Sequence, residues 1–272
     1  MTPIFGVFDL NHQSYSQEYL QAMGHALKFG NSAITKIWNG PAVSLGYCDF
    51  QDREQAPALF THQPSGVTVV ADVFLDNRPE ILAALSLSDG HDSQLIALAY
   101  LQWGSDFLAH LDGDFSFVLW DPNLCTLICA RDRFGVRPLV YSFVPGKTLF
   151  IASHTAALLA MPEFKPTINE HFVAGILADL WESAEQSPFN EVLRLPPGHS
   201  LVIEQGGEPR LSCYWSPQQL PELNLPNDSD YSEKFSKLLL DATLRRTDPR
   251  VQVGVELSGG LDSPSVICAA QQ

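Results

Sequence analysis

The apolar run from Val251 to Leu257 ends at a turn that contains two consecutive glycines, and this pattern limits most strongly what the chain can fold into. The turn reads Ser-Gly-Gly-Leu-Asp-Ser from Ser258 to Ser263, and Pro264 follows it. We expect a strand, a tight glycine turn, and a helix that begins at Ser263 with Pro264 in its first turn. A strand that leads directly into a helix is typical of α/β domains.

The glycine turn also presents groups that bind anions. The start of a helix offers unpaired main-chain N–H groups and the positive end of the helix dipole. Gly259 and Gly260 can adopt positive φ and leave room for an oxygen near the backbone. Ser258 and Ser263 add hydroxyl donors, and Asp262 can reach a Mg²⁺ that accompanies phosphate. The whole hexapeptide therefore predicts a phosphate site, although Ser-Gly-Gly alone is more often a plain connection. The Walker spacing, Gly-x-x-x-x-Gly-Lys, is absent.

Composition narrows the class of protein. The 272 residues suffice for one large domain or two ordinary ones. The net charge of −15 is spread along the chain, which argues against nucleic-acid binding because that function needs a basic surface. No apolar run approaches the roughly 20 residues that cross a bilayer, and the N-terminus does not read as a secretory signal. We therefore expect no membrane association and a cytoplasmic location.

The cysteines and histidines do not predict a metal site. Cys125 and Cys129 lie in an apolar, strand-like run, and no second Cys/His pair stands at zinc-binding spacing. The five cysteines are odd in number, and we expect them to be buried free thiols. His154, His171 and His199 show no metal spacing and are expected to be ordinary surface or core residues.

The pattern of elements changes near residue 220. Before it, short strands form hairpins, which we expect to pair Phe115–Trp120 with Thr126–Ala130 and Val140–Phe143 with Leu149–Ser153. Helical spacing of apolar residues predicts helices at Tyr15–Phe29, Pro79–Leu85, Asp92–Trp103, Asn169–Leu180 and Tyr231–Thr247. Residues 218–230 are polar and proline-bearing, as linkers are. We therefore predict a domain over 1–217, a linker over 218–230, and the beginning of a second domain over 231–272.

The second domain is too short to stand alone. A parallel α/β domain cannot be built from one helix, one strand and the few residues after the glycine turn, so the apolar face of Val251–Leu257 lacks neighbours. We expect either that the chain is a fragment, or that a homodimer or another partner completes this domain.

Several segments resemble one family in the correct order. Met1–Phe8, Asp112–Phe117 and Ala130–Leu139 are similar to the start, the strand pair and the Arg-Asp loop of class II glutamine amidotransferases. Leu195–His199 and Tyr214-Trp215 resemble the end of that domain in asparagine synthetases, and Ser258–Ser263 resembles the pyrophosphate loop of ATP pyrophosphatases. The chain thus resembles the asparagine synthetase family over nearly its whole length. The resemblance implies an α+β fold: a four-layered αββα sandwich of the N-terminal-nucleophile hydrolase type, then the first strand, loop and helix of an ATP pyrophosphatase domain that uses ATP and Mg²⁺.

The sequence departs from this family where glutamine is hydrolysed. Working members carry a cysteine nucleophile after Met1, whereas this chain has Thr2, and Pro3 is expected to hinder removal of Met1. The family's glutamine-binding Arg has no counterpart in Leu45–Asp49. Its Asn-Gly pair falls on Ala71-Asp72, where a carboxylate would oppose a developing oxyanion. Asp92 stands where the acid that grips the substrate amine is expected, as a remnant of that site, although capping of the following helix is the favoured reading.

These departures predict a degenerate glutaminase domain, with Thr2 at the former nucleophile position. The resemblance then implies an ATP-dependent, AMP-forming amide ligase that adenylates a small-molecule or peptide carboxylate for attack by an amine. Members without the N-terminal cysteine resemble β-lactam synthetases and lasso-peptide cyclases. The segment Leu75–Arg78 looks like a Leu-Asp-Asn-Arg segment of such members. A structural alternative is that Asn77 and Pro79 simply start a helix.

Two other functions stay open. One is a true asparagine synthetase that takes ammonia, or glutamine through Thr2. The other is a non-catalytic paralogue that serves as a binding or assembly module. Arg131 and Asp132 are expected to form a buried structural pair rather than to contact substrate.

Overall fold

A computed structural model describes residues 2–11, 17–28, 33–50, 57–162, 164–180, 183–247 and 253–271. The chain divides into two compact units, residues 1–217 and 218–272, which are described separately below. Among the described residues, no helix is both long and apolar enough to cross a membrane.

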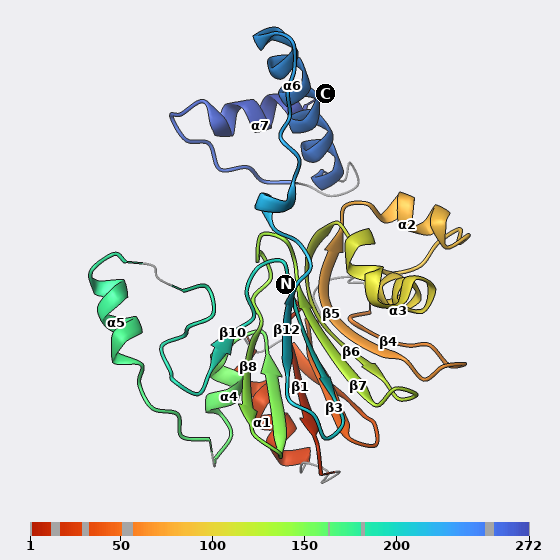
Figure 1. The fold of residues 1–272 in the computed structure, drawn as a ribbon, viewed down its shortest axis with the longest axis vertical. Coiled ribbons are helices and arrows are strands. Elements are labelled where there is room, and N and C mark those ends of the chain that lie inside the picture. The colour runs from red at the N-terminus through yellow and green to blue at the C-terminus, as the bar shows by residue number, and fades with distance from the viewer. Residues whose placement is uncertain are drawn as a thin grey trace. The chain divides into compact units, whose positions relative to one another are not determined.

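Unit 1 contains two antiparallel sheets, each of six described strands (Figure 1). Sheet A has the order β10 (Leu193–Arg194), β8 (Val140–Val144), β9 (Thr148–Ala152), β1 (Ile4–Asp9), β3 (Val43–Phe50), β2 (Ala33–Asn39). Sheet B has the order β12 (Arg210–Cys213), β11 (His199–Glu204), β7 (Thr126–Arg131), β6 (Gly113–Asp121), β5 (Thr68–Leu75), β4 (Leu59–Thr61). The N-terminal strand β1 is therefore central in sheet A, between β9 and β3.

Helices cover the outer face of each sheet. The helices of unit 1 are α1 (Gln17–Ala26), α2 (Arg78–Ala84), α3 (Asp92–Trp103), the 3₁₀ helix η1 (Gly104–His110), α4 (Thr155–Leu159) and α5 (Glu170–Leu177). One buried cluster lies between α3 and sheet B and includes Ile96 and Phe117. Another joins α1 and α4 to sheet A through Leu20 and Leu158. The predicted αββα sandwich is confirmed.

The two sheets pack on each other through a third apolar cluster. Phe8 of β1 and Trp120 of β6 meet there, with their ring centroids 5.3 Å apart. Alternation along β5, β6 and β7 directs every second residue into this interface. Two residues of one such row, Val70 and Val118, face each other across β5 and β6 and are fully buried. The inter-sheet face therefore excludes water along most of its length.

Most predicted elements of unit 1 are present, with small shifts at their ends. The hairpins β6–β7 and β8–β9 form as expected, and α3 has the predicted bounds. Asp121 fixes the β6–β7 turn because its Oδ1 accepts a hydrogen bond of 2.8 Å from the Asn123 N–H. The helix expected over Asn169–Leu180 is the shorter α5. Residues 12–16 and 29–32 lie outside the described residues, so α1 tests only the middle of the helix expected at Tyr15–Phe29.

Unit 2 contains two helices and an extended segment. The 3₁₀ helix η2 (Pro217–Gln219) spans the boundary between the units, and α6 (Asp228–Arg246) and α7 (Asp262–Ala270) follow. The strand expected at Val251–Leu257 is not formed over residues 253–257, which are extended without a paired neighbour; residues 251–252 lie outside the described part. Val253, Val255 and Leu257 are exposed, because a strand needs a sheet to join and these described residues have none.

Candidate functional site

The main-chain nitrogen of Thr2 lies beside a buried carboxylate. Thr2 precedes β1 in sheet A, and its N–H donates a hydrogen bond of 3.0 Å to Asp72 Oδ1 on β5 of sheet B. The Asp72 side chain is only 6% exposed. A contact between residues 70 positions apart thus joins the two sheets at the amino-terminal end of β1. The carboxylate lies at the position where the sequence predicts loss of the oxyanion-binding Asn-Gly pair.

Other polar groups surround Asp72 in the space between the sheets. Arg137 Nη1 lies 3.6 Å from Asp72 Oδ1. Asp72, Ser116 and Arg131 stand directly opposite one another on β5, β6 and β7, two residues beyond the apolar row that fills the inter-sheet core. The hydroxyl of Ser116 is buried without a hydrogen-bond partner, as is Nε of Arg137. Asp72 therefore lies in a small polar region that closes one end of the core.

The loop from Arg131 to Leu139 carries Arg137 to this region and is held by its own acid. Asp132 is 1% exposed, and its carboxylate accepts hydrogen bonds from the N–H groups of Phe134, Val136 and Arg137 at 2.9–3.1 Å. An acceptor that satisfies three adjacent amides fixes the loop backbone. Asp132 therefore fixes the position of the backbone from which the Arg137 side chain extends.

Arg131 supports the same loop from the other side. Its guanidinium donates to the carbonyl oxygens of Arg137, Leu195 and Gly135 at 2.6–2.8 Å. Burial lowers the pKa of Arg131, and Asp132 opposes this shift. The expected structural role agrees with these contacts. The expected pairing does not, because the hydrogen bonds described for both side chains go to main-chain groups, those of the loop and the Leu195 carbonyl, and not to each other.

Asp92 is engaged by protein groups rather than presented to a ligand. It is the first residue of α3, but the cap is His91, whose ring nitrogen accepts from the Gln94 N–H. Asp92 Oδ1 accepts a bond of 2.6 Å from Arg78, and Oδ2 accepts one of 3.0 Å from the Leu75 N–H. The helix-cap interpretation of Asp92 is therefore wrong. Its proposed role as a glutamine-binding remnant stays a prediction, and the Arg78 contact leaves less of its charge for a substrate amine.

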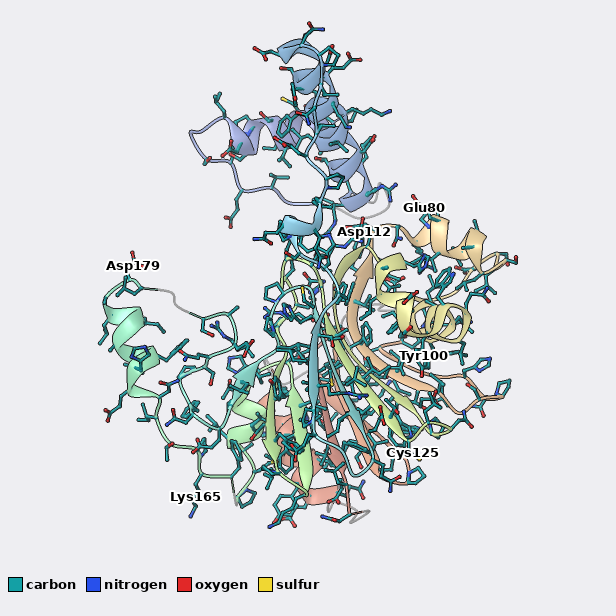
Figure 2. The ribbon with its side chains drawn as sticks, viewed as in Figure 1. Glu80, Tyr100, Asp112, Cys125, Lys165 and Asp179 are labelled. Carbon is teal, nitrogen blue, oxygen red and sulfur yellow. The ribbon has the colours of Figure 1, made fainter. Side chains whose placement is uncertain are left out.

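The Leu-Asp-Asn-Arg segment has a structural use that the sequence did not reveal. Asn77 occupies the N-cap position of α2 with Pro79 in the first turn, but its side chain makes no cap bond. Instead its amide donates to the His110 carbonyl at 2.9 Å and accepts from the Asp112 N–H at 3.0 Å. Figure 2 shows Asp112 at this end of sheet B and Cys125 at the far end, where β6 turns into β7. Asn77 thus ties the start of α2 to the start of β6.

The glycine turn of unit 2 is compact and exposed. Helix α7 begins at Asp262, one residue earlier than predicted, and Pro264 lies in its first turn as expected. Ser263 Oγ accepts from the Ser258 N–H at 2.9 Å and lies 2.8 Å from Ser258 Oγ. Gly259 and Gly260, which can adopt positive φ, do not do so in this structure. A Cβ built on Gly259 meets no heavy atom within 4 Å, so an oxygen has room to approach that backbone.

The thiols differ from the sequence expectation. Cys48 and Cys129 are buried, Cys125 is half-buried, and Cys213 and Cys268 are exposed. Burial raises the pKa of Cys48 to about 11, and it also raises the pKa of Cys129. No group of three or more His, Cys, Asp or Glu side chains among the described residues is arranged to hold a metal ion.

Thiol labelling near neutral pH should separate these cysteines. Burial disfavours the reactive thiolate form and also blocks access of the reagent, so we expect Cys48 and Cys129 to react at least about 10²-fold more slowly than the exposed Cys213 and Cys268. Mass spectrometry of maleimide-treated native protein measures the rates. Equal labelling of Cys129 and Cys213 in protein that is still folded would contradict the packing of β7.

Comparisons with known proteins agree with this architecture. A model of the glutamine amidotransferase domain matches residues 1–215, and a model of asparagine synthase matches residues 234–272. Because the first match covers most of the chain, the chain belongs to the glutamine amidotransferase family. With the start of an asparagine synthase domain behind it, the chain is a member of the asparagine synthetase family.

Individual relatives show how much of such proteins the chain spans. Amidase chyE from Penicillium rubens is 31% identical over 191 residues, which are 70% of this chain and 28% of that protein. Glutamine-hydrolyzing asparagine synthetase 3 from Bacillus subtilis is 27% identical over 251 residues, 87% of this chain and 39% of that protein. The glutamine phosphoribosylpyrophosphate amidotransferase structure from B. subtilis shares the fold, with a TM-score of 0.52 at 14% identity over 78% of this chain and 49% of that chain. The chain thus spans well under half the length of both the amidase and the asparagine synthetase.

Proposed function

We propose that this chain belongs to an ATP-dependent, AMP-forming amide ligase whose amidotransferase domain does not hydrolyse glutamine. The ligase would adenylate the carboxylate of a small molecule or peptide, and an amine would attack the adenylate. The proposal combines the family membership with one observation, the contact between the Thr2 N–H and the buried Asp72 carboxylate.

That contact argues against glutamine hydrolysis at position 2. Amide hydrolysis develops negative charge on the substrate oxygen, and hydrogen-bond donors must surround it. Asp72 presents acceptor oxygens and negative charge in this region instead, 3.0 Å from the Thr2 nitrogen. A threonine nucleophile also needs a free α-amine or another base. The local chemistry is therefore opposite to what an oxyanion needs.

The glycine turn has the donors that suit a nucleotide phosphate. Ser258 and Ser263 provide hydroxyls, and the first turn of α7 provides main-chain N–H groups. The carboxylate of Asp262, also in this first turn, would repel phosphate unless a cation stood between them, and Mg²⁺ takes such oxygen ligands. When bound, Mg²⁺–ATP would supply the activated phosphate; Ser258 and Ser263 would orient it, and Asp262 would hold the cation.

The test is pyrophosphate release from ATP by the full-length protein, with aspartate, ammonia and glutamine varied. Release that needs aspartate and rises with ammonia but not with glutamine supports the proposal for aspartate as substrate. We expect Asp262→Asn to lower release by about 10²-fold. Ser265→Ala is the matched control, because that hydroxyl donates to the carbonyl of Leu261, the N-cap residue of the same helix, at 2.7 Å.

Other outcomes select the alternatives. Release that rises with glutamine would contradict the silent amidotransferase domain and favour a glutamine-dependent asparagine synthetase. Release without aspartate but with a peptide or another amino acid would keep the ligase and change its substrate. Absence of release with every carboxylate would favour a binding or assembly module.

A further inference from the structure

The Thr2–Asp72 contact has a consequence for the amino terminus itself. The acceptor is a carboxylate with 6% of its side chain exposed, and the donor is the nitrogen that would be the α-amine of a chain without Met1. In an N-terminal-nucleophile enzyme this nitrogen is the base that takes the proton of the hydroxyl or thiol. The state of this one nitrogen therefore decides whether Thr2 can act.

We propose that Asp72 is a positioning residue that clamps the main-chain nitrogen of Thr2 and keeps position 2 from acting as a nucleophile, whether or not Met1 is removed. This inference rests on the silent amidotransferase domain proposed above and names the side chain that silences it. Arg137, 3.6 Å from the same carboxylate oxygen, and the Asp132-held loop behind it keep Asp72 in place.

The clamp works in both forms of the chain. When Met1 is present, the Thr2 nitrogen is an amide, has no basic lone pair, and donates its proton to Asp72 Oδ1. When Met1 is absent, the nitrogen becomes an amine within hydrogen-bond distance of a carboxylate, which favours the ammonium form. An ammonium cannot accept the proton of the Thr2 hydroxyl, so the hydroxyl stays protonated and weakly nucleophilic.

Three other described residues near the start of β1 also bear on this contact; one of them is cationic, and two contribute neutral groups. Arg137, whose Nη1 lies 3.6 Å from the same Asp72 oxygen, is cationic and weakens the hold of Asp72 on an ammonium. From sheet A, Ser153 accepts through its hydroxyl from the Ile4 N–H, and Cys48 donates its main-chain N–H to the Pro3 carbonyl. The Cys48 thiol is neutral near pH 7 because burial raises its pKa to about 11. Asp72 is the acid that these contacts place at hydrogen-bond distance from this nitrogen.

The experiment measures the reactivity of the Thr2 α-amine in full-length protein released by proteolysis to begin at Thr2. An amine-acylating reagent is added between pH 6 and 10, and the N-terminal peptide is quantified by mass spectrometry. Only the free amine reacts. We expect Asp72→Asn to raise the labelling rate at pH 7 by about tenfold or more and to move the midpoint of the pH profile down by at least about one unit.

Asp49→Asn is the matched control. It also removes one carboxylate, from the adjacent strand β3, but Asp49 pairs with Lys36 rather than with Thr2. We expect its labelling profile to equal that of the unmodified chain. If Asp72→Asn does not keep the native circular dichroism spectrum, Asp72→Ser provides the second neutral variant. A folded neutral variant with an unchanged midpoint would overturn the proposal.

The readout is independent of the proposed function. Amine labelling requires neither ATP nor glutamine, so a shifted midpoint together with glutamine-dependent pyrophosphate release would retain the Asp72 contact and reject its silencing role. An unshifted midpoint without glutamine use would reject Asp72 as the cause while leaving the ligase proposal intact.

Discussion

Asp132→Ala is expected to destabilise unit 1 by about 3–5 kcal/mol in free energy of unfolding. The substitution leaves the N–H groups of Phe134, Val136 and Arg137 without their acceptor at a site that is 1% exposed. It also removes the negative charge nearest to the buried Arg131 guanidinium. Each of these losses carries a desolvation cost that water cannot repay in the native state.

Tryptophan fluorescence during urea unfolding measures this effect in the whole chain. All five tryptophans lie in unit 1, at Trp38, Trp103, Trp120, Trp181 and Trp215. Asp132→Asn keeps one acceptor oxygen and is expected to cost less than Asp132→Ala. Asp106→Ala, at an exposed site in η1, should stay within about 0.5 kcal/mol of the unmodified chain. Equal midpoints for Asp132→Ala and Asp106→Ala would show that Asp132 does not hold the loop.

Gly113→Ala is expected to cost at least about 3 kcal/mol. Gly113 begins β6 with φ 145°, in a region that L side chains rarely adopt. A Cβ there would lie 2.3 Å from the Phe74 carbonyl oxygen and 2.8 Å from Leu75 Cα, both main-chain atoms of the paired strand β5. Relief would require β5 and β6 to separate next to Asp72 and Ser116, so the polar region would shift as well.

Gly146→Ala is the control variant, because it introduces backbone strain without a steric clash. Gly146 has φ 67°, and a Cβ there would meet no heavy atom within 4 Å. We expect a cost of about 1–2 kcal/mol, from backbone conformation alone. The same urea titration measures both variants. A Gly113→Ala cost no larger than that of Gly146→Ala would mean that β5 does not approach Gly113 as closely as described.

Local patterns predicted the elements that depend on local chemistry. The β6–β7 and β8–β9 hairpins follow from alternating strands around turn residues, and α3 follows from apolar spacing between His91 and Trp103. The strand predicted before the glycine turn is not formed. A strand is stabilised by pairing with neighbouring strands, and residues 253–257 have no strand beside them among the described residues. The glycine turn is closed by hydrogen bonds of its own serine hydroxyls, from the Ser258 N–H to Ser263 Oγ and from the Gly260 N–H to Ser258 Oγ, and neither glycine needs positive φ in it.

The sequence predicts only part of the candidate site. The family resemblance points to Thr2, Asp72 and Asp92 as site positions, and these assignments stay predictions; it does not indicate their hydrogen-bond partners. Thr2 and Asp72 are 70 residues apart, and only the packing of sheet A on sheet B brings them together. The sequence favours Asp92 as a helix cap because a short acid before a helix usually caps it. In the structure the Arg78 side chain, from the first residue of α2, binds this carboxylate instead.

A glutaminase assay tests most directly whether the amidotransferase domain is inactive. Glutamate formation from glutamine is measured with the full-length protein, both with Met1 present and in the form released to begin at Thr2, against buffer. We expect no glutamate above the uncatalysed background in either form, because Asp72 accepts a hydrogen bond from the Thr2 nitrogen and stands where the family resemblance predicts the oxyanion-binding Asn-Gly pair. Glutamate formation that is lost in a Thr2→Ala variant would contradict this expectation.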